Sequence, residues 1–186
     1  MSYCYIQVCG IESAVARSPD DYEALLLGHC RLLSDGYPRA ALVFCVESNL
    51  GFESSHISRM VQDVRSVIIM YEAKSGVPGM QTTHQSKEVM HSLLSDKLRE
   101  NAVAFVDPLL TCGTTPPEKL RAEMLTQLSN YAIVVDRPDK MSQPFKFARK
   151  TYTGKHWGND DLCVMLQFNL LAHKRFFANA RYRRYW

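Results

Sequence analysis

Several motifs that would identify a function directly are missing from this chain. It has no GxxxxGK[ST] phosphate-binding loop, so we expect no ATP hydrolysis by these residues alone. It also has no GxSxG and no GxGxxG following a strand, the motifs of α/β-hydrolases and dinucleotide-binding folds. Any function must therefore be argued from less regular patterns.

Disulfide and zinc frameworks have little support either. The six cysteines include no CxxC pair and most of them lie within apolar runs, which predicts buried thiols. No two histidines have HxxxH or HxxxxH spacing, so we expect no zinc site. A chain of 186 residues buries roughly 70% of its unfolded surface on folding, so it needs no such crosslink.

Long hydrophobic segments are absent as well. The longest apolar runs, 40–46 and 67–71, are far shorter than the roughly 20 residues of a membrane-spanning helix. The N-terminus has no basic region ahead of an apolar run, which argues against secretion. We expect one globular domain without a membrane partner, in the cytosol or nucleus.

The chain does contain alternating strand-like and helix-like segments. Strands are predicted at 3–9, 40–46, 67–71, 103–106, 131–135 and 145–152. Helices are predicted from Ser18-Pro19 to about Gly36, from about 54, at 86–99, at 115–128, and from Asn159-Asp160-Asp161 onward, where the acids would cap the helix. This order predicts an α/β fold in which the first three strands share one mixed sheet flanked by helices.

Basic side chains gather near the C-terminus, although the net charge is only +3. Residues 173–186 contain no acid and five basic residues, Lys174, Arg175, Arg181, Arg183 and Arg184. These cations would either interact with the negative end of a helix dipole or contact nucleic-acid phosphates, with interleaved aromatic rings offering stacking faces. Residues 137–156 hold six basic residues and one acid, which predicts a second positive surface.

Acidic residues stand at two element boundaries. Glu47 ends the apolar strand 40–46, and Asp160 and Asp161 open the last helix. Such carboxylates can converge on one sheet edge, where oxygen ligands suit Mg²⁺ or Mn²⁺, and two metals there would promote phosphodiester cleavage. Ordinary strand ends and helix caps show the same pattern, so the spacing alone leaves both interpretations open.

Three segments resemble ordered blocks of one family: VESNLG at 46–51, THQSKEVMHSLLSDKL at 83–98 and KTYTGKHWGNDDLCVMLQFNLLA at 150–172. They are similar to the nuclease domain of large terminase subunits, the DNA-packaging motors of tailed phages and herpesviruses. The last block resembles the herpesvirus proteins most closely. The resemblance implies an RNase H-like fold in which three acids bind two Mg²⁺ or Mn²⁺ ions and cut concatemeric viral DNA.

The resemblance also implies the setting of this activity. The chain would act in the host nucleus on double-stranded viral DNA. Its partners would be the remaining terminase segment with the ATPase domain, the other terminase subunits and the portal. The nuclease domain would cover residues 1–172, followed by a basic aromatic tail at 173–186.

Individual residues can be matched to the family by position. Glu47 matches its second acid, and Asp160 and Asp161 match the pair at its third, so these are the catalytic and metal-binding candidates. Lys87 belongs to a block that shapes the middle of the family fold, on what is otherwise an ordinary amphipathic helix. Lys155, beside the acid pair, and the five tail cations are the DNA-binding candidates, with solvated surface positions as the alternative.

The first acid of the family, in an Asp-Pro motif on a central strand, has no counterpart at the matching position. Glu12 follows an edge strand, and Asp107-Pro108 comes too late in the chain. The predicted fold therefore lacks the first strands of the family fold, and we expect a C-terminal exon product or fragment that needs an upstream segment for activity. The alternatives are a non-catalytic DNA-binding or packaging accessory protein and, with less support, a cellular resolvase-like nuclease.

Overall fold

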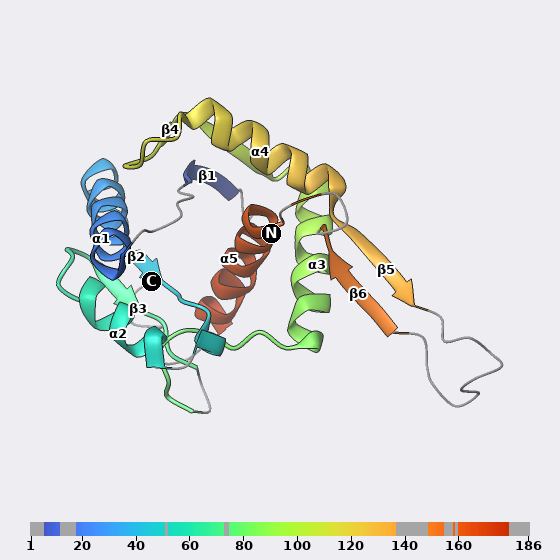
Figure 1. The fold of residues 1–186 in the computed structure, drawn as a ribbon, viewed down its shortest axis with the longest axis horizontal. Helices are drawn as coiled ribbons and strands as arrows, with labels where there is room; N and C mark the ends of the chain where they lie inside the picture. The colour runs from blue at the N-terminus through green and yellow to red at the C-terminus, as the bar shows by residue number, and fades with distance from the viewer. Residues whose placement is uncertain are drawn as a thin grey trace.

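The protein has the α/β class predicted from its sequence. A computed structural model describes residues 6–11, 18–50, 52–72, 75–136, 149–154, 158 and 160–178. Within these ranges, five α-helices pack with three two-stranded sheets (Figure 1). None of the helices in the described ranges combines the length and the apolar character needed to cross a membrane.

The first half of the chain alternates short strands with helices. Its elements are β1 (Ile6–Gly10), α1 (Pro19–Gly36), β2 (Leu42–Phe44), the 3-10 helix η1 (Ser48–Leu50), α2 (Phe52–Val61) and β3 (Val67–Ile69). Helix α1 begins as predicted, because the Ser18 hydroxyl accepts a hydrogen bond from the Asp21 amide at 3.2 Å. It ends at Gly36, also as predicted.

The second half contains longer elements. They are α3 (His84–Arg99), β4 (Val103–Leu110), α4 (Pro117–Asn130), β5 (Ala132–Asp136), β6 (Arg149–Thr153) and α5 (Asp161–Ala178). Helix α3 starts two residues earlier than expected because Thr83 and Ser86 form a capping box in which each side chain bonds the other residue's amide. The predicted existence and type of each of these elements are confirmed.

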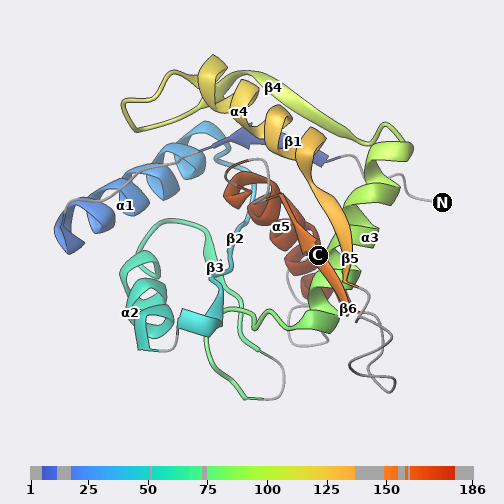
Figure 2. The same ribbon diagram turned by 45° about the vertical axis from the view of Figure 1, so that its right-hand side comes forward.

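Strand pairing differs from the expected single sheet. Strand β1 pairs in parallel with β4, β2 pairs in parallel with β3, and β5 pairs antiparallel with β6. The prediction that the first three strands share one mixed sheet is therefore wrong for the described residues. The reason lies in α5, which occupies the centre of the molecule in Figures 1 and 2 and is apolar on more than one face.

Each face of α5 packs against a different part of the molecule. Leu162, Leu166 and Leu170 join a core cluster with residues of β1, β4 and α4. Phe168 and Leu171 join a second cluster with residues of β2, β3 and α3. Because one helix buries both surfaces, the two parallel strand pairs need not be adjacent to each other.

Strand β2 is covered on both sides, as its continuous apolar sequence predicts. Val43 and Cys45 pack against the cluster that contains α5, whereas Leu42 and Phe44 pack against a third cluster formed with α1 and α2. The alternation follows from the two-residue period of a strand. The strand is shorter than the predicted 40–46, and Glu47 follows three residues after its last residue, Phe44. This end of β2 is thereby fixed between two helical layers.

The cysteines follow their prediction in part. Cys30 and Cys163 are buried, and burial raises the pKa of Cys163 to about 11. Cys45 is half-buried, and burial raises its pKa to about 12. Cys112 is exposed, contrary to prediction, and its thiol donates a hydrogen bond to the Leu25 carbonyl at 3.4 Å. The raised pKa values leave Cys45 and Cys163 as thiols at neutral pH, which suits packing rather than nucleophilic catalysis.

Candidate functional site

Glu47 is held beside a second chain segment at the end of β2. It forms an isolated parallel bridge with Met80, in which the Met80 amide donates to the Val46 carbonyl at 2.9 Å and the Ser48 amide donates to the Met80 carbonyl at 3.1 Å. These bonds extend the strand pairing beyond β2 itself. As a result, residues 80–82 run alongside residues 46–48.

Gly79 permits this close approach. Its φ is +95°, and a Cβ atom there would lie 2.2 Å from the Val46 carbonyl oxygen, so no other residue fits without moving the backbone. The Gly79 amide also donates to the Met70 carbonyl at 2.7 Å. The loop predicted from Gly76, Pro78 and Gly79 thus brings the chain back against the segment that follows β2.

The Glu47 carboxylate is engaged on one oxygen. Glu47 Oε1 accepts a hydrogen bond from Asn49 Nδ2 at 3.0 Å and another from the Thr82 hydroxyl. Asn49 Nδ2 is also 2.6 Å from Thr82 Oγ1 and 3.0 Å from the Thr82 carbonyl oxygen. Glu47, Asn49 and Thr82 therefore form a closed triangle of polar contacts, called here the Glu47 triad.

The Glu47 triad opens onto a polar pocket of about 300 Å³. The pocket takes residues from the end of β2, the loop before α3, the first turns of α3, and β6. Its lining consists of Glu47, Asn49, Thr82, Thr83, His84, Lys87, Thr151 and Tyr152. Lys87, an exposed residue of α3, is the single cation among these lining residues.

Aromatic contacts fix β6 against α3 beside this pocket. The Tyr152 ring centroid lies 5.3 Å from that of His91 and 6.2 Å from that of His84, and His91 also stacks on Tyr131 at 5.9 Å. Burial lowers the pKa of His91, so its ring is neutral at pH 7. Burial and the nearby Glu88 carboxylate raise the pKa of Tyr152, whose hydroxyl stays protonated. Tyr152, which lines the pocket, is therefore packed against the neutral ring of His91 behind it.

Asp160 occupies a different environment. Its residue is only 3% exposed, and its Oδ2 accepts hydrogen bonds from the Gly154 amide at 2.9 Å and the Thr153 hydroxyl at 3.2 Å. A Cβ atom on Gly154 would lie 3.0 Å from Asp160 Cβ, so glycine allows the end of β6 to approach α5. The carboxylate thus binds the end of β6 to the start of α5.

The amino end of α5 is capped by a residue that the sequence did not indicate. The Val164 amide donates to the Asp160 carbonyl at 2.9 Å, which places Asp160 at the predicted cap position. Its side chain does not cap the helix, however. Gln127 Oε1, on α4, instead accepts from the Leu162 amide at 2.7 Å and the Cys163 amide at 3.2 Å.

Gln127 could have been noticed from its position in the sequence. It lies on the inward face of α4 with Leu120 and Met124, and it is 4% exposed. A polar residue at an apolar helical position needs a buried partner. The sequence does not say which partner, because the amides that it binds lie 35 and 36 positions further along the chain.

The acidic candidates do not form one cluster. Glu47 lines the pocket, whereas Asp160 does not, although its partner Thr153 directly follows the pocket residues Thr151 and Tyr152. Asp161 is exposed as the first residue of α5. Across the described ranges, no group of three or more His, Cys, Asp or Glu residues could hold a metal ion. Glu47 is the single carboxylate of the pocket lining, so the described residues do not assemble the implied three-acid set.

The DNA-binding candidates fall into two groups. Lys155, Arg181, Arg183 and Arg184 lie outside the described residues. Lys174 is exposed on α5, while Arg175 Nη1 lies 3.7 Å from Glu72 Oε2, whose carboxylate also accepts from the Gln81 amide at 3.2 Å. Arg175 therefore contacts the loop that leads to the Glu47 triad.

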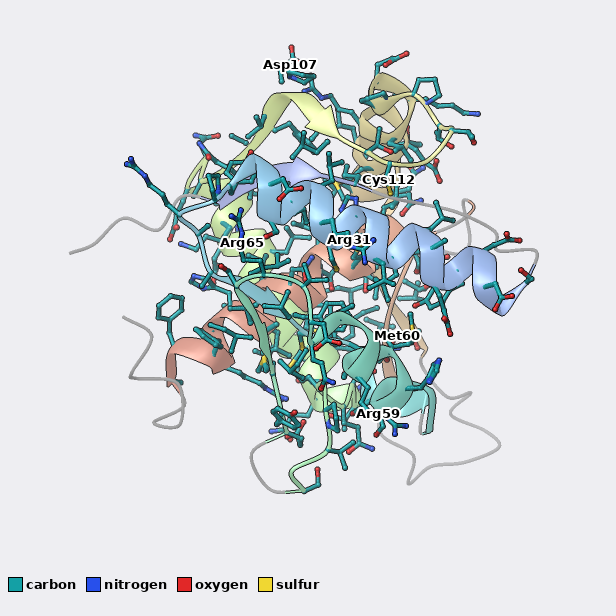
Figure 3. All side chains as sticks on the ribbon, turned by 90° about the vertical axis from the view of Figure 1, so that its left-hand side faces the viewer. Arg31, Arg59, Met60, Arg65, Asp107 and Cys112 are labelled. Atoms are coloured by element: carbon teal, nitrogen blue, oxygen red, sulfur yellow. The ribbon has the colours of Figure 1, made fainter. Side chains whose placement is uncertain are left out.

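Glu12 and Asp107 are the two acids that the sequence offers as replacements for the first acid. Glu12 lies outside the described residues. Asp107 points outward from β4 in Figure 3, its side chain is 85% exposed, and its carboxylate lies 3.5 Å from Arg121 Nη2. It does not line the pocket. Asp107 therefore supplies no further acid beside Glu47.

Comparisons of this chain with protein-family models, curated proteins and solved structures gave no match. The function must therefore be argued from the residues and their geometry.

Proposed function

We propose that this chain is the nuclease domain of a herpesvirus-type large terminase subunit, with an RNase H-like fold, and that it takes part in metal-dependent cutting of concatemeric viral DNA. One observation carries the proposal. Segments 46–51, 83–98 and 150–172, on which the terminase resemblance rests, all contribute residues to the same polar pocket. Side chains of three segments that are distant in the sequence can therefore act together on one bound group.

The pocket residues suit a phosphodiester substrate. Glu47 offers an oxygen ligand of the kind that Mg²⁺ and Mn²⁺ prefer, and Lys87 offers a positive charge for a DNA phosphate. A bound divalent cation would supply Lewis-acid stabilisation and an activated water. The aromatic rings of Tyr152 and His84 would limit the approach of bulk water to one side of the site.

The described residues account for only part of a two-metal site. Each missing carboxylate removes a charge that would offset the desolvation of the cation, so we expect weak metal binding and little cutting by these residues alone. A segment that carries an Asp-Pro strand would supply the first acid of the family. The remaining packaging machinery would consist of the ATPase segment, the other terminase subunits and the portal. The proposed setting is the host nucleus.

The test is to join this chain to such an upstream segment and to measure Mn²⁺-dependent cutting of double-stranded DNA. We expect sequence-tolerant cutting that Glu47→Ala abolishes. Asp107→Ala is the matched control, because it removes an exposed carboxylate that does not line the pocket. Undiminished cutting by a folded Glu47→Ala protein would show that Glu47 is not a metal ligand.

A non-catalytic DNA-binding or packaging accessory protein is the second candidate. It is favoured by the burial of Asp160, whose Oδ2 is already committed to the Gly154 amide and the Thr153 hydroxyl. In that case the joined protein would bind DNA in a salt-dependent manner without cutting it, whatever metal is added.

The tail should be tested by truncation after Ala178 rather than after Ala172. Helix α5 continues to Ala178, and Phe176 is 4% exposed within a core cluster, so an earlier truncation would remove core packing. If Arg181, Arg183 and Arg184 contact phosphates, the later truncation should make the salt dependence of DNA binding shallower. An unchanged salt dependence would exclude the DNA-contact interpretation of these three residues.

A further inference from the structure

One edge of β2 has no strand beside it in the described ranges. On the opposite edge, the Leu42 amide donates to the Ser66 carbonyl and the Met70 amide donates to the Phe44 carbonyl, both at 2.9 Å. Backbone groups of successive residues in a strand point to opposite edges, so those of Val43 point away from β3. An unpaired edge of this kind is a template for a further extended segment.

The burial of β2 is lower than its sequence predicts. The run 40–46 is continuously apolar, and such runs are typical of fully buried strands. Packing on its two faces nevertheless leaves Leu42, Val43 and Phe44 only half-buried. The strand therefore keeps apolar surface that another segment can cover.

An apolar pocket of about 340 Å³ lies along this strand, between β2 and α5 (Figure 2). Ala41, Val43 and Cys45 line it from the strand, and residues between Asn169 and Phe177 line it from α5. None of its described lining residues belongs to β3. The pocket is therefore on the side of the unpaired edge.

The pocket is suited to aromatic side chains. Phe176 and Phe177 line it with ring centroids 5.6 Å apart, and the Phe177 ring centroid lies 4.6 Å from that of His173. Burial and the nearby Lys97 lower the pKa of His173, so the described lining is uncharged at pH 7. A cavity of about 150 Å³ can hold one benzene molecule. This pocket has room for two aromatic rings.

The eight residues that follow α5, 179–186, have a sequence that fits this surface. Alternate residues of an extended segment share a face. That spacing places Ala180, Tyr182 and Trp186 on one face and Arg181 and Arg183 on the other. One face of such a segment would carry two aromatic rings, and the opposite face would carry positive charge.

This tail also begins beside the pocket. Helix α5 ends at Ala178, one residue after the pocket residue Phe177. Eight extended residues span up to about 26 Å, whereas the helix from Phe177 back to Asn169 measures about 12 Å. The tail is therefore long enough to turn after α5 and to run along the whole pocket.

We infer that residues 179–186 add to the unpaired edge of β2 as a further strand, with Tyr182 and Trp186 in the pocket between β2 and α5. Main-chain hydrogen bonds to the strand edge hold the tail, and the pocket selects its aromatic side chains, as in other cases of β-strand addition. Arg181 and Arg183 then face the solvent. This inference goes beyond the proposed function and does not depend on it.

The first test follows the fluorescence of Trp186 in the 186-residue chain with Trp157→Phe, which leaves Trp186 as the only tryptophan. A docked ring is shielded from solvent, so we expect acrylamide quenching to be several-fold weaker than in the same protein unfolded in urea. Quenching as strong as in the unfolded protein would overturn the inference. Protection that disappears on dilution would also overturn it, because the tail would then bind a second copy of the chain.

A variant that fills the pocket shows whether the tail binds there. Asn169→Phe adds a ring at an exposed pocket position of α5, so we expect Trp186 quenching to rise to nearly the unfolded value. Gln85→Phe makes the same kind of change at an exposed position of α3 outside the pocket lining and should leave quenching unchanged. Ala41→Phe serves if Asn169→Phe does not fold. Protection that survives in a folded pocket variant would contradict the inference.

Hydrogen exchange tests the strand addition without any tryptophan variant. In the intact chain, tail carbonyls accept a hydrogen bond from the Val43 amide, so truncation after Ala178 should speed exchange of this amide several-fold. The Leu42 amide is the internal control, because it donates to the Ser66 carbonyl with or without the tail. Equal exchange of the Val43 amide in the intact and truncated chains would show that the tail does not pair with β2.

Discussion

Glu47 and Asp160 are both carboxylates at element boundaries, and each accepts a hydrogen bond from a threonine hydroxyl. Their surroundings differ in one decisive respect. Asp160 is 3% exposed and bonds a main-chain amide, so it links β6 to α5, whereas Glu47 is half-buried, bonds only side chains and faces a polar pocket. A carboxylate that matches a catalytic pattern can thus serve mainly the fold, as Asp160 does, while Glu47 lies at the surface of a pocket.

Gln127 helps to explain this difference. Because its side-chain oxygen satisfies the first amides of α5, the Asp160 carboxylate is not needed as the helix cap and turns instead toward Gly154. Among the described residues, the Glu47 carboxylate bonds only Asn49 and Thr82. These polar groups satisfy one another within the Glu47 triad, at the surface of the pocket.

The largest expected effect separates the two carboxylates by stability. Asp160→Ala leaves the Gly154 amide without its charged partner in a buried position, so we expect a loss of about 3 kcal/mol in the free energy of unfolding. Glu47→Ala should cost only about 0.5 kcal/mol, because its partners can turn to water. Urea unfolding of both variants measures the contrast, and similar losses would contradict the division into structural and ligand-facing acids.

A change in the backbone at Gly79 should disturb the position of Glu47, although the two residues are far apart in the sequence. Gly79→Ala places a Cβ against the Val46 carbonyl at a positive φ, and we expect a loss of about 2 to 3 kcal/mol together with weaker Mn²⁺ binding. Gly76→Ala is the control, since φ there is also positive but nothing lies within 4 Å of the added Cβ. It should cost only about 1 kcal/mol. Equal effects in urea unfolding would mean that the contact with Val46 carries no constraint.

Removing the cap of α5 should lower stability near Asp160 without changing the pocket at Glu47. Gln127→Leu leaves the buried Leu162 and Cys163 amides without their acceptor, which should cost about 1 to 2 kcal/mol and speed hydrogen exchange at Leu162. Gln85→Leu makes the same change at an exposed position of α3 and should be nearly neutral. Mn²⁺ affinity should stay unchanged in Gln127→Leu. If it falls with the stability, the two regions are coupled rather than independent.

The smallest expected effect concerns Lys87 and DNA. If Lys87 contacts one phosphate, Lys87→Ala should lower the slope of log affinity against log salt by about 0.9 for duplex DNA. Lys119→Ala removes an exposed lysine from α4, away from the pocket lining, and serves as the control. Salt titrations of DNA binding measure both slopes. Identical slopes in the two variants would remove Lys87 from the DNA-binding candidates.

Local sequence signals predicted the elements well. Ser18 as a helix cap, the turn at Gly76 to Gly79 and the apolar run before Glu47 each act over a few residues, and the structure places them as expected. The single mixed sheet was predicted from the order of strands, which does not specify their partners. Helix α5 changed the outcome because its two apolar faces bury separate strand pairs.

The sequence by itself determined the α/β class, the helix boundaries to within about two residues and the position of Glu47 shortly after β2, because these depend on periodicity and capping within about one or two turns of chain. Only the tertiary structure decided which oxygens and amides meet. Thr82 reaches Glu47 across 35 positions, and Gln127 reaches the Leu162 amide across the same separation. Such contacts depend on how α3, α4 and α5 pack, and packing is a property of the whole chain that no local pattern encodes.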